Sequence, residues 1–290
     1  MKKFLSILLA LTMILSLGML VACNDEPATP DNEVTDNNET DKPEEEPKKE
    51  TLTCGITIIP GLNERDADGN WIGFESEFAM AVADILGMEV KFQEIDWSQK
   101  YNELNSGAID CVWNGFTANS TDKVNGIDVK RSDLVDFSYG YMLNQQCIVV
   151  KADNVASITS EADLAGKTAC VEGGSAGAAY AETVTDADKI FSTTAQINAF
   201  TEVKSGAVDF AVVDIILAKN VCGNGDYEDL AIVDAIELES EIYAVGFKTG
   251  SELTAKVNEA IKTLNENGKL MEIAKKYGFE NVLQVSETIE

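Results

Sequence analysis

Alternation of short β-branched runs with helix-like segments limits the fold of this chain more than any other feature. In the helix-like segments, apolar residues recur on one helical face. The expected strands are 52–59, 90–95, 109–113, 146–150, 168–171, 189–191 and 210–213, and the expected helices are 74–86, 99–106, 176–183, 195–205 and 215–221. Strands that alternate with helices form parallel sheets covered by helices, so we predict an α/β fold.

The order of elements repeats once. Residues 104–110 read Leu-Asn-Ser-Gly-Ala-Ile-Asp, and residues 203–209, 99 positions later, read Val-Lys-Ser-Gly-Ala-Val-Asp. Each copy has a helix end, a glycine stop and a strand start. We interpret them as two α/β lobes of similar design. The alternative is that helix–glycine–strand junctions are common in any α/β protein.

The N-terminus has the pattern of an exported protein. Lys2 and Lys3 precede an apolar stretch, and Leu-Val-Ala stands directly before Cys23, so we predict a signal peptide at residues 1–22. The junction resembles a bacterial lipobox, which implies that Cys23 carries a lipid. The chain would then sit at the cell membrane, lipid-anchored on its extracellular face. The alternative is a membrane span with an incidental cysteine.

Charge and composition separate a spacer from a folded part. Residues 24–50 hold 11 Asp/Glu, 3 Lys and 4 Pro, with almost no apolar side chains. Such a segment cannot bury enough surface to offset its ordering entropy, so residues 23–50 are expected to form a lipidated, disordered acidic tether. Residues 51–290 hold 39 Asp/Glu against 17 Lys/Arg, a formal charge of −22. That charge repels phosphates, and we expect no nucleic acid partner.

The absence of histidine narrows the chemistry. The sequence contains no His, which removes His-based catalytic triads and almost all zinc sites, and we expect neither metal nor cofactor. Beyond Cys23, the cysteines have irregular spacing and never form Cys-x-x-Cys. We expect buried free thiols, with pairing left open, at Cys54, Cys111, Cys147, Cys170 and Cys222.

Residues 51–283 resemble the amino-acid-binding lipoproteins of ABC importers, the extracellular solute-binding proteins of the polar amino acid class. The resemblance rests on motifs in family order: 68–75, Trp97, 114–117, Arg131 with 135–138, 163–167, 173–175, 209–214, 243–247 and 275–278. It implies a type II periplasmic-binding-protein fold, with a mostly parallel sheet flanked by helices in each lobe. Lobe one would be 51–140 plus 243–285 and lobe two 143–240, joined by two crossing strands near Tyr141 and Ile242.

The same resemblance implies a function without catalysis. The protein would bind a free polar amino acid outside the cell and deliver it to an ABC transporter permease, acting as a monomer. A dehydratase-type enzyme on this fold is one alternative, with Glu64 or Glu172 as its acid or base. A ligand-sensing domain is the other.

The resemblance also assigns ligand-binding residues. Arg131 would bind the ligand's α-carboxylate, because its planar fork donates two hydrogen bonds at once. Asp214 would pair with the α-ammonium, although capping the helix from Ile215 is its alternative role. Trp97 would form an aromatic wall over the ligand. The remaining candidates are Asn114, Gly115, Phe116 and Thr117 in lobe one and Gly174, Ser175 and Ala176 in lobe two.

One departure from the family pattern lies inside this set. Thirteen residues separate Thr117 from Arg131, where the family has only a few. If the extra loop displaces Arg131, Lys123 or Lys130 would take the carboxylate. Glu172, like Glu64, either favours a cationic ligand side chain or faces solvent.

Overall fold

The computed structural model describes residues 49–289, which belong to one compact unit. The predicted signal peptide, Cys23 and nearly all of the spacer lie outside the described residues. Within residues 49–289, no helix is both long and apolar enough to cross a membrane.

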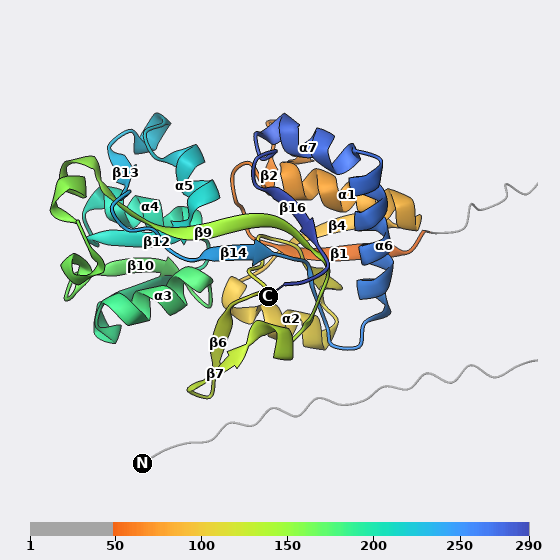
Figure 1. Ribbon diagram of the computed structural model, residues 1–290, viewed down its shortest axis with the longest axis horizontal. Coiled ribbons are helices and arrows are strands. Elements are labelled where there is room, and N and C mark those ends of the chain that lie inside the picture. Colours follow the sequence, from red (N-terminus) through yellow and green to blue (C-terminus); the bar gives the residue numbers. More distant parts are fainter. Residues whose placement is uncertain (1–48, 290) are drawn as a thin grey trace, which may run out of the picture. The chain divides into compact units, whose positions relative to one another are not determined.

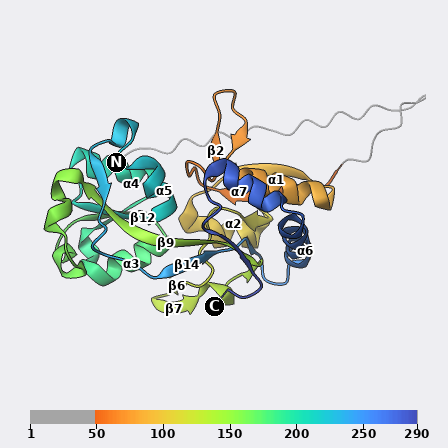
Figure 2. The ribbon, with the colours of Figure 1, turned by 45° about the horizontal axis from the view of Figure 1, so that its top comes forward.

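Lobe one is built on a five-stranded sheet in the order β4-β1-β5-β15-β8 (Figure 1). Its strands are β1 (Thr51–Ile56), β4 (Glu89–Glu94), β5 (Cys111–Val112), β8 (Asp136–Phe137) and β15 (Gly246–Phe247). Its helices are α1 (Phe74–Leu86), α2 (Lys100–Ser106), α6 (Glu252–Glu266) and α7 (Lys269–Tyr277). A short hairpin of β2 (Glu64–Arg65) and β3 (Trp71–Ile72) projects from it (Figure 2).

Lobe two is built on a second sheet in the order β11-β10-β12-β9-β13. Its strands are β9 (Gly140–Lys151), β10 (Ala169–Glu172), β11 (Ile190–Thr193), β12 (Phe210–Asp214) and β13 (Leu230–Ile232). The helices α3 (Ala176–Val184), α4 (Gln196–Ser205) and α5 (Ile215–Val221) flank this sheet (Figure 1). Buried apolar side chains fill both of its faces.

Two long-range strand pairs connect the lobes. Strand β9 runs from lobe one into lobe two, and β14 (Ser240–Tyr243) pairs with it antiparallel, with Leu143 opposite Ile242. Strand β16 (Leu283–Ser286) pairs with the start of β9. The pairing of β9 with β14 falls where the crossing strands were expected, while the exact lobe limits remain a prediction.

Each sheet is mostly parallel, as predicted, with one strand running against the others: β15 in lobe one and β9 in lobe two. In lobe one β1 is parallel to β4 and β5, but β15 is antiparallel to β5 and β8. In lobe two β10 is parallel to β11 and β12, but β9 is antiparallel to β12 and β13. The antiparallel strands are those next to the crossing, where the chain enters a sheet from the other lobe instead of through a covering helix.

The repeated segment has the same structure in both lobes. Gly107 and Gly206 end α2 and α4 in the left-handed conformation, with φ of 76° and 78°. Asp110 Oδ2 then accepts from the backbone N–H of Thr53, and Asp209 Oδ2 accepts from that of Thr168, each at 2.7 Å. In each lobe the aspartate ties its own strand to the neighbouring parallel strand.

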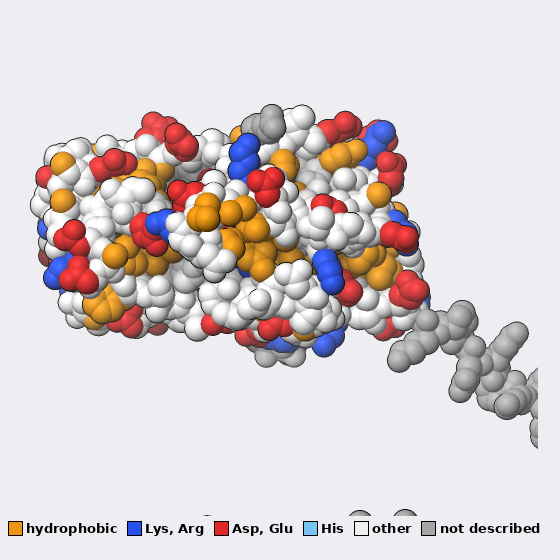
Figure 3. Space-filling model, turned by 90° about the horizontal axis from the view of Figure 1, so that it is seen from below, with side chains coloured by type: hydrophobic (Ala, Val, Ile, Leu, Met, Phe, Trp, Pro, Cys, Tyr) orange, Lys and Arg blue, Asp and Glu red, His pale blue; other side chains and the backbone are white. Residues whose placement is uncertain are grey.

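The insertion between Thr117 and Arg131 folds into a hairpin that the sequence did not predict. Strands β6 (Thr121–Val124) and β7 (Ile127–Lys130) pair antiparallel around Asn125 and Gly126. Both turn residues have positive φ, 52° and 78°, as a two-residue hairpin turn requires. The hairpin lies at the lower edge of the molecule in Figure 1. Seen from below, apolar side chains gather near the middle of the molecule, and acidic and some basic side chains are spread around them (Figure 3).

Candidate functional site: the cleft between the lobes

Residues from both lobes line one small polar cavity of about 10 Å³. The lining residues are Trp97, Asn114, Gly115, Thr117 and Arg131 from lobe one, and Gln146, Ser175, Ala176, Gln196 and Asp214 from the lobe-two sheet and its helices. Eight of the ten predicted ligand-binding residues are in this set. The other two border it: Phe116 packs behind Trp97, at 5.3 Å between ring centroids, and Gly174 precedes Ser175.

Arg131 is held rigidly at the cavity wall. It follows β7 directly and is 1% exposed. Its Nε donates to Asp122 Oδ1 at 2.9 Å, and its Nη1 donates to the carbonyl of Thr117 at 3.1 Å. Its Nη2 reaches across the cleft to the carbonyl of Gly174 at 3.3 Å. The inserted hairpin has therefore kept Arg131 in the cleft.

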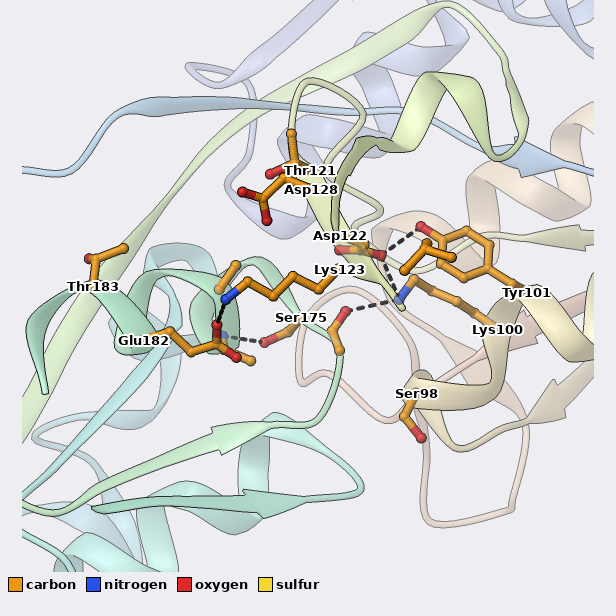
Figure 4. A pocket seen from close by; sticks show the side chains of 14 residues that line it. Ser98, Lys100, Tyr101, Thr121, Asp122, Lys123, Asp128, Ser175, Glu182 and Thr183 are labelled. Atoms are coloured by element: carbon orange, nitrogen blue, oxygen red, sulfur yellow. Dashed lines mark hydrogen bonds and ion pairs between the residues drawn. The ribbon is translucent and has the colours of Figure 1, made fainter. Parts of the chain in front are cut away.

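A second buried cation, Lys100, was not predicted from the sequence. Its Nζ donates to the carbonyl of Gly174 at 2.9 Å and lies 3.2 Å from Asp122 Oδ2. Tyr101 donates its hydroxyl to the same carboxylate at 2.6 Å (Figure 4). Burial, and then the charge of Arg131, lower the pKa of Lys100 to about 8. Burial alone would raise the pKa of Asp122, but Arg131 and Lys100 hold it below its usual value.

Asp214 and Glu172 stand side by side because they end neighbouring parallel strands, β12 and β10. Asp214 makes no capping hydrogen bond to α5 through its side chain. Its carboxylate instead accepts from the amides of Asn144, at 2.9 Å, and Gln196, at 2.6 Å, and from that of Gln146. Burial raises the pKa of Asp214 despite these donors.

Glu172 is buried rather than facing solvent. It is 2% exposed, and its Oε1 has no hydrogen-bond partner within the described residues. Burial, reinforced by the charge of Asp214, raises the pKa of Glu172 to about 8, against the opposing effect of Lys100. Glu172 is not itself among the residues that line the cavity, but it leaves a buried carboxyl group near the site without a full set of partners.

A buried glutamate behind the site fixes the loop that carries Asn114 and Gly115. Glu75 accepts from the backbone N–H of Gly115 at 2.9 Å, from Asn63 Nδ2 at 2.9 Å, and from the hydroxyl of Tyr141. Gly115 has φ of 58°, and a Cβ there would come within 3.0 Å of the Tyr243 ring, so the position requires glycine. Burial raises the pKa of Glu75 to about 7.

Several candidates lie away from the cavity. Glu64 accepts from the backbone N–H of Gly61 on the turn before β2, and the exposed Lys130 lies on the hairpin. Lys123 forms an ion pair with Glu182 of α3. The missed residues Gln146 and Gln196 are ordinary amides in sequence, and only their contacts with Asp214 mark them.

Two α/β lobes joined by crossing strands, with a buried polar site between them, define a two-lobed solute-binding protein. Residues 52–281 match the bacterial extracellular solute-binding proteins, family 3, and the chain belongs to this family. This confirms the solute-binding-protein family predicted from the sequence, while the lipid attachment stays a prediction.

Relatives span most of the chain. The arginine-binding extracellular protein ArtP of Bacillus subtilis is 30% identical over 80% of this chain and 88% of its own. The L-cystine-binding protein TcyA of the same species is 31% identical over 81% of this chain and 84% of its own. An ABC uptake transporter substrate-binding protein from Streptococcus pneumoniae, solved with bound histidine, superposes with a TM-score of 0.69 at 30% identity, covering 81% of this chain and 94% of that one.

Proposed function

We propose that this protein binds a free amino acid between its lobes outside the cell and delivers it to the permease of an ABC importer. One observation carries the proposal: Arg131 from lobe one and Asp214 from lobe two line the same buried cavity. An amino acid has a carboxylate and an ammonium on one carbon, and both need partners when they leave water. A thermal-shift screen of the twenty amino acids tests the proposal. If none of them raises the melting temperature, the proposal is contradicted.

The small cavity implies that the lobes separate to admit the ligand. A volume of about 10 Å³ accommodates no more than one water molecule. An amino acid therefore enters an open form, in which β9 and β14 act as the hinge. A ligand that contacts both lobes then favours the closed form by its differential affinity for that form.

We further propose that the ligand carries a second positive group. Asp122 is already paired with Arg131 and Lys100, and Asp214 is assigned to the α-ammonium. Glu172 remains, buried beside Asp214 and with an unpartnered oxygen. A guanidinium or ammonium on the ligand side chain would supply its partner, in keeping with the name of ArtP among the relatives.

Glu172→Gln is expected to remove the preference for arginine over citrulline, its neutral near-isostere. The unmodified protein should favour arginine by about 30-fold, or about 2 kcal/mol, because a buried charge pair forms only with the cation. Calorimetry with both ligands measures the ratio, and Glu64→Gln, on the β2–β3 hairpin, is the matched control. If the Glu172→Gln variant still prefers arginine, other residues must bind the side chain of the ligand.

The arginine-to-citrulline preference should also rise with pH between about 6 and 8. The pKa of Glu172 is raised to about 8, so below that pH the group holds a proton that an incoming cation must displace. Any change of charge at Lys100 with pH affects arginine and citrulline alike. The ratio of their affinities therefore reports only on the site that binds the ligand side chain. A ratio independent of pH would contradict this assignment.

A binding protein that serves a permease must stay near the membrane, and we propose lipid attachment at Cys23. The proposal rests on the Leu-Val-Ala-Cys junction and the acidic segment that follows it. Mass spectrometry of the mature protein from a bacterial host should show a diacylglycerol-modified N-terminal Cys23. An intact Met1, or cleavage at another position, would contradict the proposal.

We favour binding over a dehydratase-type reaction. The relatives named above are binding proteins by name. Of the two glutamates proposed as the acid or base, neither lines the cavity, and Glu172 finds its role in the ligand preference argued above. A turnover assay that detects product from a prephenate-like substrate would reverse this preference.

A further inference from the structure

The β6–β7 hairpin spans the cleft. It belongs to lobe one by sequence, yet β6 packs against α3 of lobe two. In Figure 4 its residues Asp122 and Lys123 point to opposite partners, one toward Lys100 and the other toward Glu182. The hairpin thus contacts both walls of the cleft.

Asp122 organises the buried part of this bridge. Its carboxylate binds Nε of Arg131 at 2.9 Å and lies 3.2 Å from Nζ of Lys100. Both cations then donate to one oxygen in lobe two, the carbonyl of Gly174, at 2.9 Å from Lys100 and 3.3 Å from Arg131. These contacts join lobe one to lobe two directly, between protein atoms.

The hairpin adds an outer contact. Lys123 pairs with Glu182, and their side chains are 55% and 43% exposed. An ion pair this exposed contributes little to stability. The buried, charge-assisted contacts to Gly174 therefore supply most of the bridge.

We propose that the β6–β7 hairpin is a strap that holds the cleft closed in part before ligand binds, and that Asp122 is the positioning residue that aims Lys100 and Arg131 at Gly174. Without the Asp122 charge, two buried cations would face each other with only neutral acceptors. Their repulsion would favour an open cleft, where water reaches both. The effect on ligand release rests on the proposed function, whereas the effect on closure does not.

Small-angle X-ray scattering of the ligand-free protein tests closure directly. Asp122→Asn should increase the radius of gyration, because the lobes separate. Asp128→Asn is the matched control, since Asp128 is an exposed aspartate on the same hairpin. Equal radii for the unmodified protein and both variants would overturn the strap, whether or not an amino acid binds.

Ligand release gives an independent test with variants at exposed positions. Lys123→Ala and Glu182→Ala should each speed the dissociation of arginine, the ligand proposed above, by about 2- to 5-fold, the range of an exposed ion pair. The double variant should be no faster than either single variant, because both remove one contact. Lys130→Ala, at the other end of the hairpin, should leave the rate unchanged. Additive effects, or rates equal to the unmodified protein, would overturn the outer contact of the strap.

Discussion

Arg131→Met is expected to weaken amino acid binding by about 30-fold or more. Methionine has similar length and can stay on the Phe116 ring, over which the guanidinium lies at 5.2 Å. The ligand carboxylate would lose its charged partner in a buried site, a loss of about 2–5 kcal/mol. Asp122 would keep Lys100 as a counter-charge, so the variant leaves no carboxylate unpaired. Calorimetry with the identified ligand measures the change.

The other arginine of the chain provides the control. Arg65 lies on the exposed β2–β3 hairpin, with its guanidinium 3.9 Å from the Trp71 ring centroid. Arg65→Met should leave affinity unchanged. Agmatine, which is arginine without the carboxylate, should lose much less affinity than arginine in the Arg131 variant. Unchanged affinity for arginine itself would move the carboxylate-binding role to Lys100.

The local elements were predictable because their signals are local. Helix α1 spans Phe74–Leu86 as expected, with Gly73 before it and Gly87 in the left-handed conformation after it. The repeated Ser-Gly-Ala-x-Asp segments identified the two matching junctions. Strand β9 was expected only from Gln146, yet it begins at Gly140. The first half of β9 pairs with β14 and β16, which come much later in the chain. The sequence of this half carries little apolar pattern that would predict a strand.

The residues of the candidate site also divide into those that local sequence predicts and those that it does not. Motif order and spacing brought Arg131, Thr117, Ser175 and Asp214 to one place. Lys100 resembled a solvated helix lysine, and its partner Gly174 is 74 positions away. The long gap before Arg131 predicts an inserted loop, but no local pattern predicts that Asp122 within this loop faces two cations. The sequence does not predict the contacts that form only when the two lobes meet.

Asp214→Asn is expected to reduce amino acid affinity by at least 10-fold, about 1.4 kcal/mol, by removing the charge that pairs with the α-ammonium. The structure adds a cost in stability. The amides of Asn144, Gln146 and Gln196 all donate to the Asp214 carboxylate, and asparagine replaces one of its two acceptor oxygens with a donor. A loss of about 1–3 kcal/mol in the free energy of unfolding should follow.

A ligand comparison separates the two effects. The affinity loss should be much smaller for the des-amino analogue of the ligand, which has no ammonium to pair, while the stability loss is the same for both. Glu241→Gln is the matched control, because Glu241 shares the amides of Asn144 and Gln146 but is absent from the cavity lining. It should change affinity by less than about 5-fold, since it removes no ligand contact. Equal losses for the two ligands would mean that Asp214 shapes the cleft through the surrounding amides without touching the amine.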